Sequence, residues 1–322
     1  MKPVLLDISD LSVTFNHAES SARAVRKLSM NVIEGEIHGL VGESGSGKTV
    51  TIQCIPGLIS VPSTIIEGSV KLRGIELFDL PPEELRKLRG AEIGMIFQEP
   101  SRYLNPAFTI RNQISEMLRI HLTLDRRQAA ASALELLDQM GLGSDKRVLN
   151  SYAHELSGGM RQRAMIAMAV SCNPCLLIAD EPTTALDVTV ERQILELLLR
   201  LRDRLGMSVL FVSHNMAVVH EISDRVSVIY LGKIVESGGK DQVFTSPRHP
   251  YTRLLLEAIP DPEKRGQKLA TIPGRVPDAE HIPSGCAFHP RCPFAQERCT
   301  AQEPVPEGKD HVVSCHFAGD LS

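Results

Sequence analysis

One eight-residue stretch, GESGSGKT at residues 42–49, constrains this chain more than any other. It follows the apolar run EIHGLV and precedes a segment of helical character, so it joins a strand to a helix. Glycines at this spacing let backbone N–H groups approach phosphates, the lysine reaches the β- and γ-phosphates, and the threonine hydroxyl can ligate Mg²⁺. We therefore predict a Walker A loop whose nucleotide-binding residues are Gly42, Ser44, Gly45, Ser46, Gly47, Lys48 and Thr49.

Two adjacent carboxylates end a second apolar strand, CLLIADE at residues 175–181. The carboxyl ends of parallel strands face the ligand, so Asp180 and Glu181 are expected near the phosphates. Adjacent carboxylates can divide the work. Asp180 would hold Mg²⁺, together with Thr49, and Glu181 would position and deprotonate the attacking water. Beside a Walker A loop we prefer this interpretation to an ordinary acidic turn.

A second small-residue turn, LSGGMRQR at residues 156–163, also precedes a predicted helix. The free N–H groups and the dipole of a helix start make such a turn an anion site. The sequence therefore predicts two phosphate cradles in one chain.

Strands and helices alternate after this turn. The run ERQILELLLRLRDRL is an amphipathic helix that ends at Gly206, and buried strands are expected at 175–181, 207–214 and 225–231. This alternation indicates a mainly parallel sheet covered by helices. Short strands near the N-terminus precede any long helix and predict an antiparallel layer beside the nucleotide site; they lie at 4–15, 29–33, 36–41 and 66–77.

The composition changes near residue 247, since over half of the chain's 20 prolines lie from Pro247 onward. We predict an α/β ATP-binding domain at residues 1–246, with a helical subdomain at about 99–170. Residues 247–322 would form a loop-rich C-terminal extension, a name kept below for that segment.

Charge and hydropathy exclude several classes of protein. The net charge of −4 and the pI of about 6.3 give no basic footprint for nucleic acid. No apolar run approaches the roughly 18 residues needed to span a bilayer. Asp7 and Asp10 interrupt the region where a signal peptide would be apolar. We expect a cytoplasmic chain, whose seven cysteines are thiols or metal ligands rather than disulfides.

Five motifs in this order, GESGSGKT, FQEP, LSGGMRQR, LLIADEPTTALD and VSHN, resemble the ATP-binding subunit of an ABC transporter. The C-terminal extension is more narrowly similar to the ATPases of dipeptide and oligopeptide importers, a group that also serves nickel and other solutes. The stretches that carry this likeness are PRHPYTRLLLEAIP, LATIPGRVP and GCAFHPRCPFAQERC. Together the two resemblances cover almost the whole chain and imply the fold of an ABC ATPase.

The resemblance also implies how two cradles would be used. ATPase subunits of this family pair head to tail around two ATP molecules. Ser157 and Gly159 of one subunit would contact the γ-phosphate held by the Walker A loop of the other. Donors on both sides of the terminal phosphate would then order the charge of the transition state.

Further roles come from the resemblance alone. Phe15 would stack on adenine, although it could instead be a core residue of its strand. Asp187 would lie at the dimer interface or simply cap a helix. Gln98 would sense Mg²⁺ and the attacking water, and His214 would contact the γ-phosphate. The implied catalytic residues are Lys48, Gln98, Glu181 and His214.

The implied partners are two transmembrane permease subunits, a second ATPase subunit (a paralogue or a second copy) and an extracytoplasmic solute-binding protein. The chain would act at the cytoplasmic face of the membrane, as a peripheral subunit. Peptide is the first expectation for the solute, with nickel or another small solute as the alternative. A soluble ABC ATPase outside transport is the other alternative, although ribosome-remodelling members carry two motif sets and this chain has one.

Four of the seven cysteines gather in the C-terminal extension: Cys286, Cys292, Cys299 and Cys315. A cytoplasmic setting leaves metal ligation or free thiols. Zinc sites favour closer C-x-x-C spacing, whereas four thiolates can hold a 4Fe–4S cluster, and a proline beside a ligand also occurs in bacterial ferredoxins. The extension of dipeptide-importer ATPases resembles this one cysteine by cysteine, and the resemblance implies a structural 4Fe–4S cluster. The separate CNPC pair, Cys172 and Cys175, is expected to form only a turn.

Overall fold

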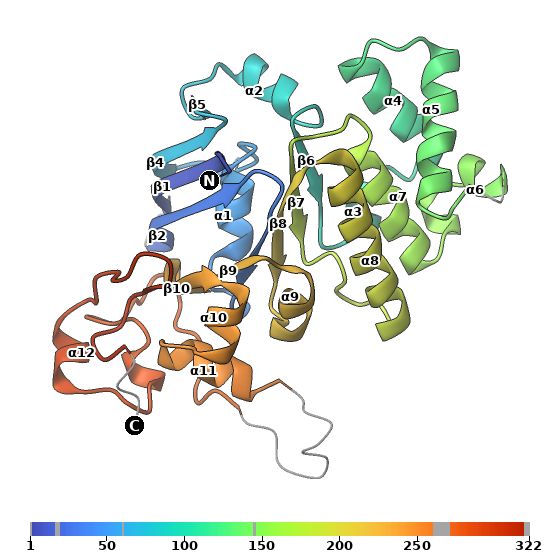
Figure 1. The fold of residues 1–322 in the computed structure, drawn as a ribbon. Helices are drawn as coiled ribbons and strands as arrows, with labels where there is room; N and C mark the ends of the chain where they lie inside the picture. Colours follow the sequence, from blue (N-terminus) through green and yellow to red (C-terminus); the bar gives the residue numbers. More distant parts are fainter. Residues whose placement is uncertain (1, 17–19, 60, 144–145, 260–270, 319–322) are drawn as a thin grey trace. The chain divides into compact units, whose positions relative to one another are not determined.

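The computed structural model describes residues 2–16, 20–59, 61–143, 146–259 and 271–318 (Figure 1). The chain divides into two compact units. Unit 1 comprises residues 1–78 and 211–322, and unit 2 comprises residues 79–210. The C-terminal extension is thus part of unit 1. A boundary at residue 247 stays a prediction.

An antiparallel sheet occupies the N-terminal part of unit 1, as predicted, but the run at 36–41 does not belong to it. Ile37–Val41 is buried throughout and pairs in parallel with Arg225–Tyr230, as suits a strand covered on both faces. The strand order of the antiparallel sheet is β2-β1-β4-β5. Alternating burial along β1 and β2 directs one face of this sheet inward, and Leu11 lies opposite Leu28 in the register. The strands are β1 (Val4–Asn16), β2 (Ser21–Ile33), β4 (Thr64–Leu72) and β5 (Ile75–Glu76).

Unit 1 also contains the strand that leads into the Walker A loop. That strand, β3 (Ile37–Val41), is buried throughout and pairs in parallel with β9 (Arg225–Tyr230). The sequence analysis did not predict the next two strands, which are antiparallel: β10 (Lys233–Gly239) pairs with β9, and β11 (Val312–Val313) pairs with β10. The last belongs to the C-terminal extension, so the extension adds a strand to this sheet.

The helices of unit 1 are short. Helix α9 packs so closely on β3 that a Cβ at Gly39 would lie 2.6 Å from Val219 Cγ1. The helix after the Walker A loop ends just before Pro56, which cannot continue it. The helices are α1 (Lys48–Cys54), α9 (Met216–Ile222), α10 (Lys240–Thr245), α11 (Pro250–Glu257) and α12 (Glu297–Ala301).

Unit 2 combines a parallel strand pair with most of the long helices. Strand β6 (Ile93–Ile96) pairs in parallel with β7 (Leu176–Asp180). Its helices are α2 (Pro82–Leu88), α3 (Pro100–Tyr103), α4 (Ile110–His121), α5 (Arg126–Gln139), α6 (Lys146–Asn150), α7 (Gly158–Val170) and α8 (Val188–Leu205). The chain passes from unit 2 to unit 1 within β8 (Ser208–Ser213). The predicted strand–helix alternation of this region is therefore confirmed.

Local sequence signals fix the helix ends in unit 2. Asp125 and Gln128 form a capping box at the start of α5. Gly206 ends α8 in a left-handed conformation, with φ at 63°. Among the described residues no helix is both long enough and apolar enough to cross a bilayer.

One buried carboxylate ties the C-terminal extension to its sheet. Glu236 of β10 is fully buried and accepts the backbone N–H groups of Arg248 (2.7 Å) and His249 (3.0 Å). His311 Nε2 lies 2.7 Å from Glu236 Oε1. The carboxylate therefore joins β10, the start of the extension and the segment before β11.

We expect Glu236→Ala to lower the free energy of unfolding by about 3 kcal/mol, because it leaves two backbone N–H groups without their acceptor. Urea unfolding followed by circular dichroism measures the change. Glu257→Ala, which removes an exposed pair with Arg253, is the matched control and should cost less than about 1 kcal/mol. Equal losses from the two variants would contradict this role of Glu236.

Candidate nucleotide site and cysteine pocket

The Walker A loop of unit 1 has a shape that only glycine permits at two positions. Gly47 has φ of 101°, and a Cβ there would lie 2.5 Å from Ala24 O. At Gly42 a Cβ would lie 2.2 Å from Ile229 O. Backbone atoms cannot move aside as a side chain can, so these glycines let the loop pack against β2 and β9.

Lys48 closes the loop upon itself. Its buried Nζ donates to the carbonyls of Gly42 (2.8 Å) and Glu43 (3.0 Å). Ser46 is also buried, and its hydroxyl has no hydrogen-bond partner in the described part of the chain. Ser44, Gly45 and Thr49 are exposed. The loop thus offers exposed backbone and a hydroxyl around an ammonium group, as phosphate binding requires.

Phe15 and His214, the other two predicted residues of unit 1, lie at strand ends. Phe15 is half-buried near the end of β1, so it is not a fully buried core residue. His214 follows β8 and is exposed. The next residue, Asn215, caps α9 by accepting the N–H of Ala217 at 3.0 Å.

In unit 2 the predicted base and the predicted sensor are in contact. Gln98 Nε2 donates to Glu181 Oε2 at 3.0 Å, and Thr184 Oγ1 donates to the same oxygen at 2.9 Å. Glu181 has φ of 45°, a conformation that non-glycine residues rarely adopt and that is concentrated at functional sites. Asp180 directly before it is buried at the end of β7. The carboxylate of Glu181 is therefore oriented by two donors.

The LSGG turn of unit 2 has the geometry of a helix start. Ser157 is the N-cap of α7, and its hydroxyl accepts the N–H of Met160 at 3.3 Å. A Cβ at Gly159 would lie 2.9 Å from Val190 Cγ1, so this glycine permits close packing on α8. Asp187 caps α8 through a 2.9 Å bond from the N–H of Val190. A place for Asp187 at a dimer interface stays a prediction.

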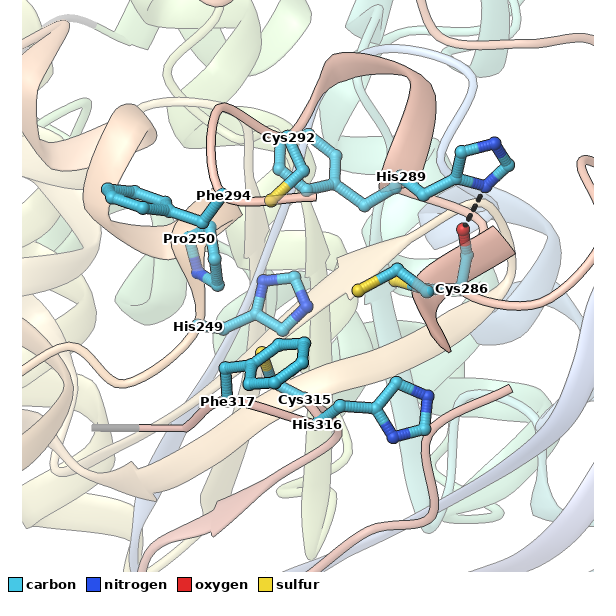
Figure 2. Close-up of a pocket in the computed structure, with 11 residues that line it drawn as sticks. His249, Pro250, Cys286, His289, Cys292, Phe294, Cys315, His316 and Phe317 are labelled. Carbon is cyan, nitrogen blue, oxygen red and sulfur yellow. Dashed lines mark hydrogen bonds between the residues drawn. The ribbon is translucent and has the colours of Figure 1, made fainter. Parts of the chain in front are cut away.

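The structure brings the four cysteines of the C-terminal extension to one pocket (Figure 2). Cys286, Cys292 and Cys315 direct their sulfur atoms toward the same space. We call this the cysteine pocket; its lining includes Cys286, Cys292, Cys299, Cys315, His249 and Phe288. Among the described residues, no group of three or more Cys, His, Asp or Glu side chains forms a site for a single metal ion.

Burial and mutual repulsion raise the pKa of three of these thiols, Cys286, Cys292 and Cys315. Burial, followed by the neighbouring thiols, raises the pKa of Cys292 to about 11. The same two causes raise the pKa of Cys286 and of Cys315. The backbone N–H of the residue two positions later acts in the opposite direction and favours a lower pKa of each of these thiols, in the repeated pattern Cys-x-Phe that ends at Phe288, Phe294 and Phe317. These donors favour thiolates, so a bound cation could deprotonate the set.

Some features fall outside these sites. Cys172 and Cys175 have separate partners, the carbonyls of Met117 and Glu92. The stretch LATIPGRVP lies partly in residues 260–270, outside the described residues. The sequence analysis missed the ion pair between Glu43 and Arg291 (2.7 Å), because no local signal joins positions 248 residues apart.

Comparison with known proteins decides the family. Residues 25–184 match the family model described as ABC transporter, and residues 235–299 match the C-terminal region of oligopeptide/dipeptide transporters. A Brucella melitensis ATP-binding protein provisionally named for peptide import is 50% identical over 97% of this chain and 96% of its own length. The dipeptide transport ATP-binding protein DppD of Escherichia coli is 43% identical, over 98% of this chain and 97% of its own length. This chain belongs to the ABC transporter ATP-binding family.

Solved structures agree with that assignment. The dimeric ATP-binding cassette MJ0796, bound to ADP and phosphate after hydrolysis, is 29% identical, with a TM-score of 0.66 over 73% of this chain and 99% of that one. CbiO1 from Clostridium perfringens, at 24% identity and a TM-score of 0.64 over 76% and 92%, supports the fold alone. The predicted α/β ABC ATPase fold is confirmed, and the protein is an ATPase.

We expect Glu181→Gln in this ABC ATPase to lower steady-state ATP hydrolysis by about 10²–10⁴-fold and to leave ATP binding intact. The amide keeps the size and one acceptor oxygen for Gln98 but cannot take a proton from water. Phosphate release and binding of a fluorescent ATP analogue measure the two quantities. The control is Glu196→Gln on the exposed face of α8. Hydrolysis at the parent rate would show that another group is the base.

Proposed function

We propose that this ABC ATPase energises an importer of di- or oligopeptides at the cytoplasmic face of the membrane. The observation that carries the proposal is the match of residues 235–299 to the C-terminal region of oligopeptide/dipeptide transporters. The near full-length similarity to the dipeptide transport protein DppD supports it. The partners would be two transmembrane permeases, a second ATPase subunit and an extracytoplasmic solute-binding protein.

Each ATP would be held by two subunits in this mechanism. The Walker A residues of one chain would bind its phosphates, and Ser157 and Gly159 of the partner would donate to the γ-phosphate from the other side. The dimeric state of MJ0796 supports such a pair. Because ATP joins the two subunits, hydrolysis would loosen the dimer and reset the permeases.

Within each site, the residues of this chain would have separate roles in binding and hydrolysing ATP. Glu181 would take a proton from the attacking water, and Gln98, already bonded to Glu181, would orient that water. Lys48 and His214 would stabilise charge on the γ-phosphate, and Phe15 would stack on the base. Thr49 and Asp180 would hold Mg²⁺, since hydroxyl and carboxylate oxygens are ligands of the kind this ion binds and the Thr49 side chain is exposed. When bound, Mg²⁺ neutralises charge on the phosphates.

The cysteine pocket supports a second, structural proposal, a 4Fe–4S cluster held by Cys286, Cys292, Cys299 and Cys315. The residues fit: four cysteines line one pocket, and a neighbouring backbone N–H favours the thiolate form of three of them. The cluster would supply a covalent cross-link for a segment with few apolar side chains.

We expect the isolated chain to hydrolyse ATP slowly, and assembly with both permeases and the second ATPase to raise the rate. In proteoliposomes, dipeptide with the solute-binding protein should stimulate hydrolysis and enter the vesicles. Rate measurement with dipeptide, nickel ion or neither tests the solute. Stimulation by nickel alone would replace the peptide assignment, and full activity of a monomer would overturn the shared site.

We expect protein purified without oxygen to be brown and to contain iron and acid-labile sulfide in equal amounts. Cys292→Ser should bleach the colour, because it removes one ligand, whereas Cys175→Ser, outside the cysteine pocket, should not. Iron, sulfide and zinc analysis provides the measurement. Stoichiometric zinc without sulfide would contradict the cluster.

A further inference from the structure

The second residue of the Walker A loop forms an ion pair with the C-terminal extension. Arg291 Nη1 lies 2.7 Å from Glu43 Oε2, and Arg291 Nη2 lies 2.9 Å from Glu43 Oε1. This bidentate geometry fixes the guanidinium plane relative to the carboxylate plane. Charge-assisted hydrogen bonds of this kind are about twice as strong as neutral ones. The Arg291 side chain is only 4% exposed, so water screens the pair poorly.

The guanidinium of Arg291 is oriented by groups other than Glu43. Its Nε donates to Pro273 O at 2.8 Å. Its Cζ lies over the rings of Tyr230 and Phe288, at 5.8 and 6.0 Å from their centroids. Arg291 therefore presents a preorganised fork to Glu43 rather than a mobile surface charge.

A second contact from the C-terminal extension holds the backbone of Glu43. The Glu43 N–H donates to the hydroxyl of Tyr251 at 2.9 Å. Tyr251 packs against Tyr230 and Phe288, with ring centroids 4.8 and 5.2 Å away. Both the carboxylate and the amide of Glu43 are thus attached to one aromatic cluster.

Glu43 also contacts the lysine of the loop, since its carbonyl accepts Lys48 Nζ at 3.0 Å. The tip of the loop beyond it has little support: Ser44 and Gly45 are exposed, and nothing lies within 4 Å of a Cβ built on Gly45. The contacts of Glu43 therefore add a side-chain anchor next to the backbone packing of Gly42 at the start of the loop.

We propose that the C-terminal extension positions the Walker A loop for ATP through the ion pair of Arg291 and Glu43. Arg291 is a positioning residue in this view. It acts through Glu43 on the backbone N–H groups and on Lys48, and it does not touch the nucleotide. The proposal needs only the ATPase activity and is independent of which solute is imported.

A double-mutant cycle tests the proposal in the full-length chain and in the assembled transporter. The variants are Arg291→Ala, Glu43→Gln and their combination, with Arg291→Lys as the conservative change. The control is Arg298→Ala, which removes an exposed bond to Gln302 in the same extension. The measurements are the Kd of Mg-ATP, the kcat and KM for ATP, the melting temperature and the iron content.

We expect each single variant to raise the Kd and KM for ATP by about 10-fold to 100-fold, because a small displacement of a binding loop has effects of this size. The change in kcat should be smaller than the change in Kd and KM, and the control Arg298→Ala should leave all three unchanged. The Kd of the double variant for ATP should not exceed the higher of the two single-variant Kd values, since both changes remove the same contact. Arg291→Lys should recover part of the affinity.

Two outcomes would overturn the proposal. One is a lower melting temperature of Arg291→Ala with unchanged ATP affinity in every variant, which would make the pair a structural anchor of the extension. The other is additive effects of the two single changes, which would mean that they act separately. If Arg291→Ala fails to fold, the ATP affinity of Glu43→Gln tests the proposal, because that variant changes no residue of the C-terminal extension.

Discussion

The arrangement of unit 1 depends on the absence of two side chains. Gly42 and Gly47 allow the Walker A loop to approach the backbone of Ile229 and Ala24 within distances that no Cβ would tolerate. The loop can then curl around Lys48, whose ammonium group bonds to the carbonyls at its start. A side chain at either position would force the loop away from β2 and β9, and with it the phosphate-binding N–H groups. The same two glycines therefore allow both the close packing of the loop and the position of its phosphate-binding N–H groups.

Two carboxylates, the buried Glu236 and the partly exposed Glu43, connect the C-terminal extension to the rest of unit 1. Glu236 receives two backbone N–H groups and lies beside His311, whereas Glu43 receives the guanidinium of Arg291. Few apolar side chains are available in this proline-rich segment, so charge-assisted bonds and a small aromatic cluster replace a hydrophobic core. The extension is consequently built into unit 1 and is more than an appendage.

Much of the fold and the site could be predicted locally. The Walker A loop and the helix end at Gly206 are signals carried by neighbouring residues, and each appeared where expected. Strands β10 and β11 were missed because β11 has two residues and exists only through pairing with β10. The assigned roles of Phe15, His214, Ser157 and Gly159 stay predictions, because they concern a nucleotide and a second subunit.

The sequence by itself determined the chemistry: a lysine and glycines for phosphate, two carboxylates after a strand, and four thiols in a proline-rich segment. Only the tertiary structure decided which of these groups meet. Gln98 reaches Glu181 across 83 residues, four cysteines face one pocket, and Arg291 reaches Glu43 across 248 residues. Local sequence patterns encode backbone conformation and residue type. Contacts between distant residues depend on how the chain folds back over long loops, and no periodic pattern in the sequence reports that folding.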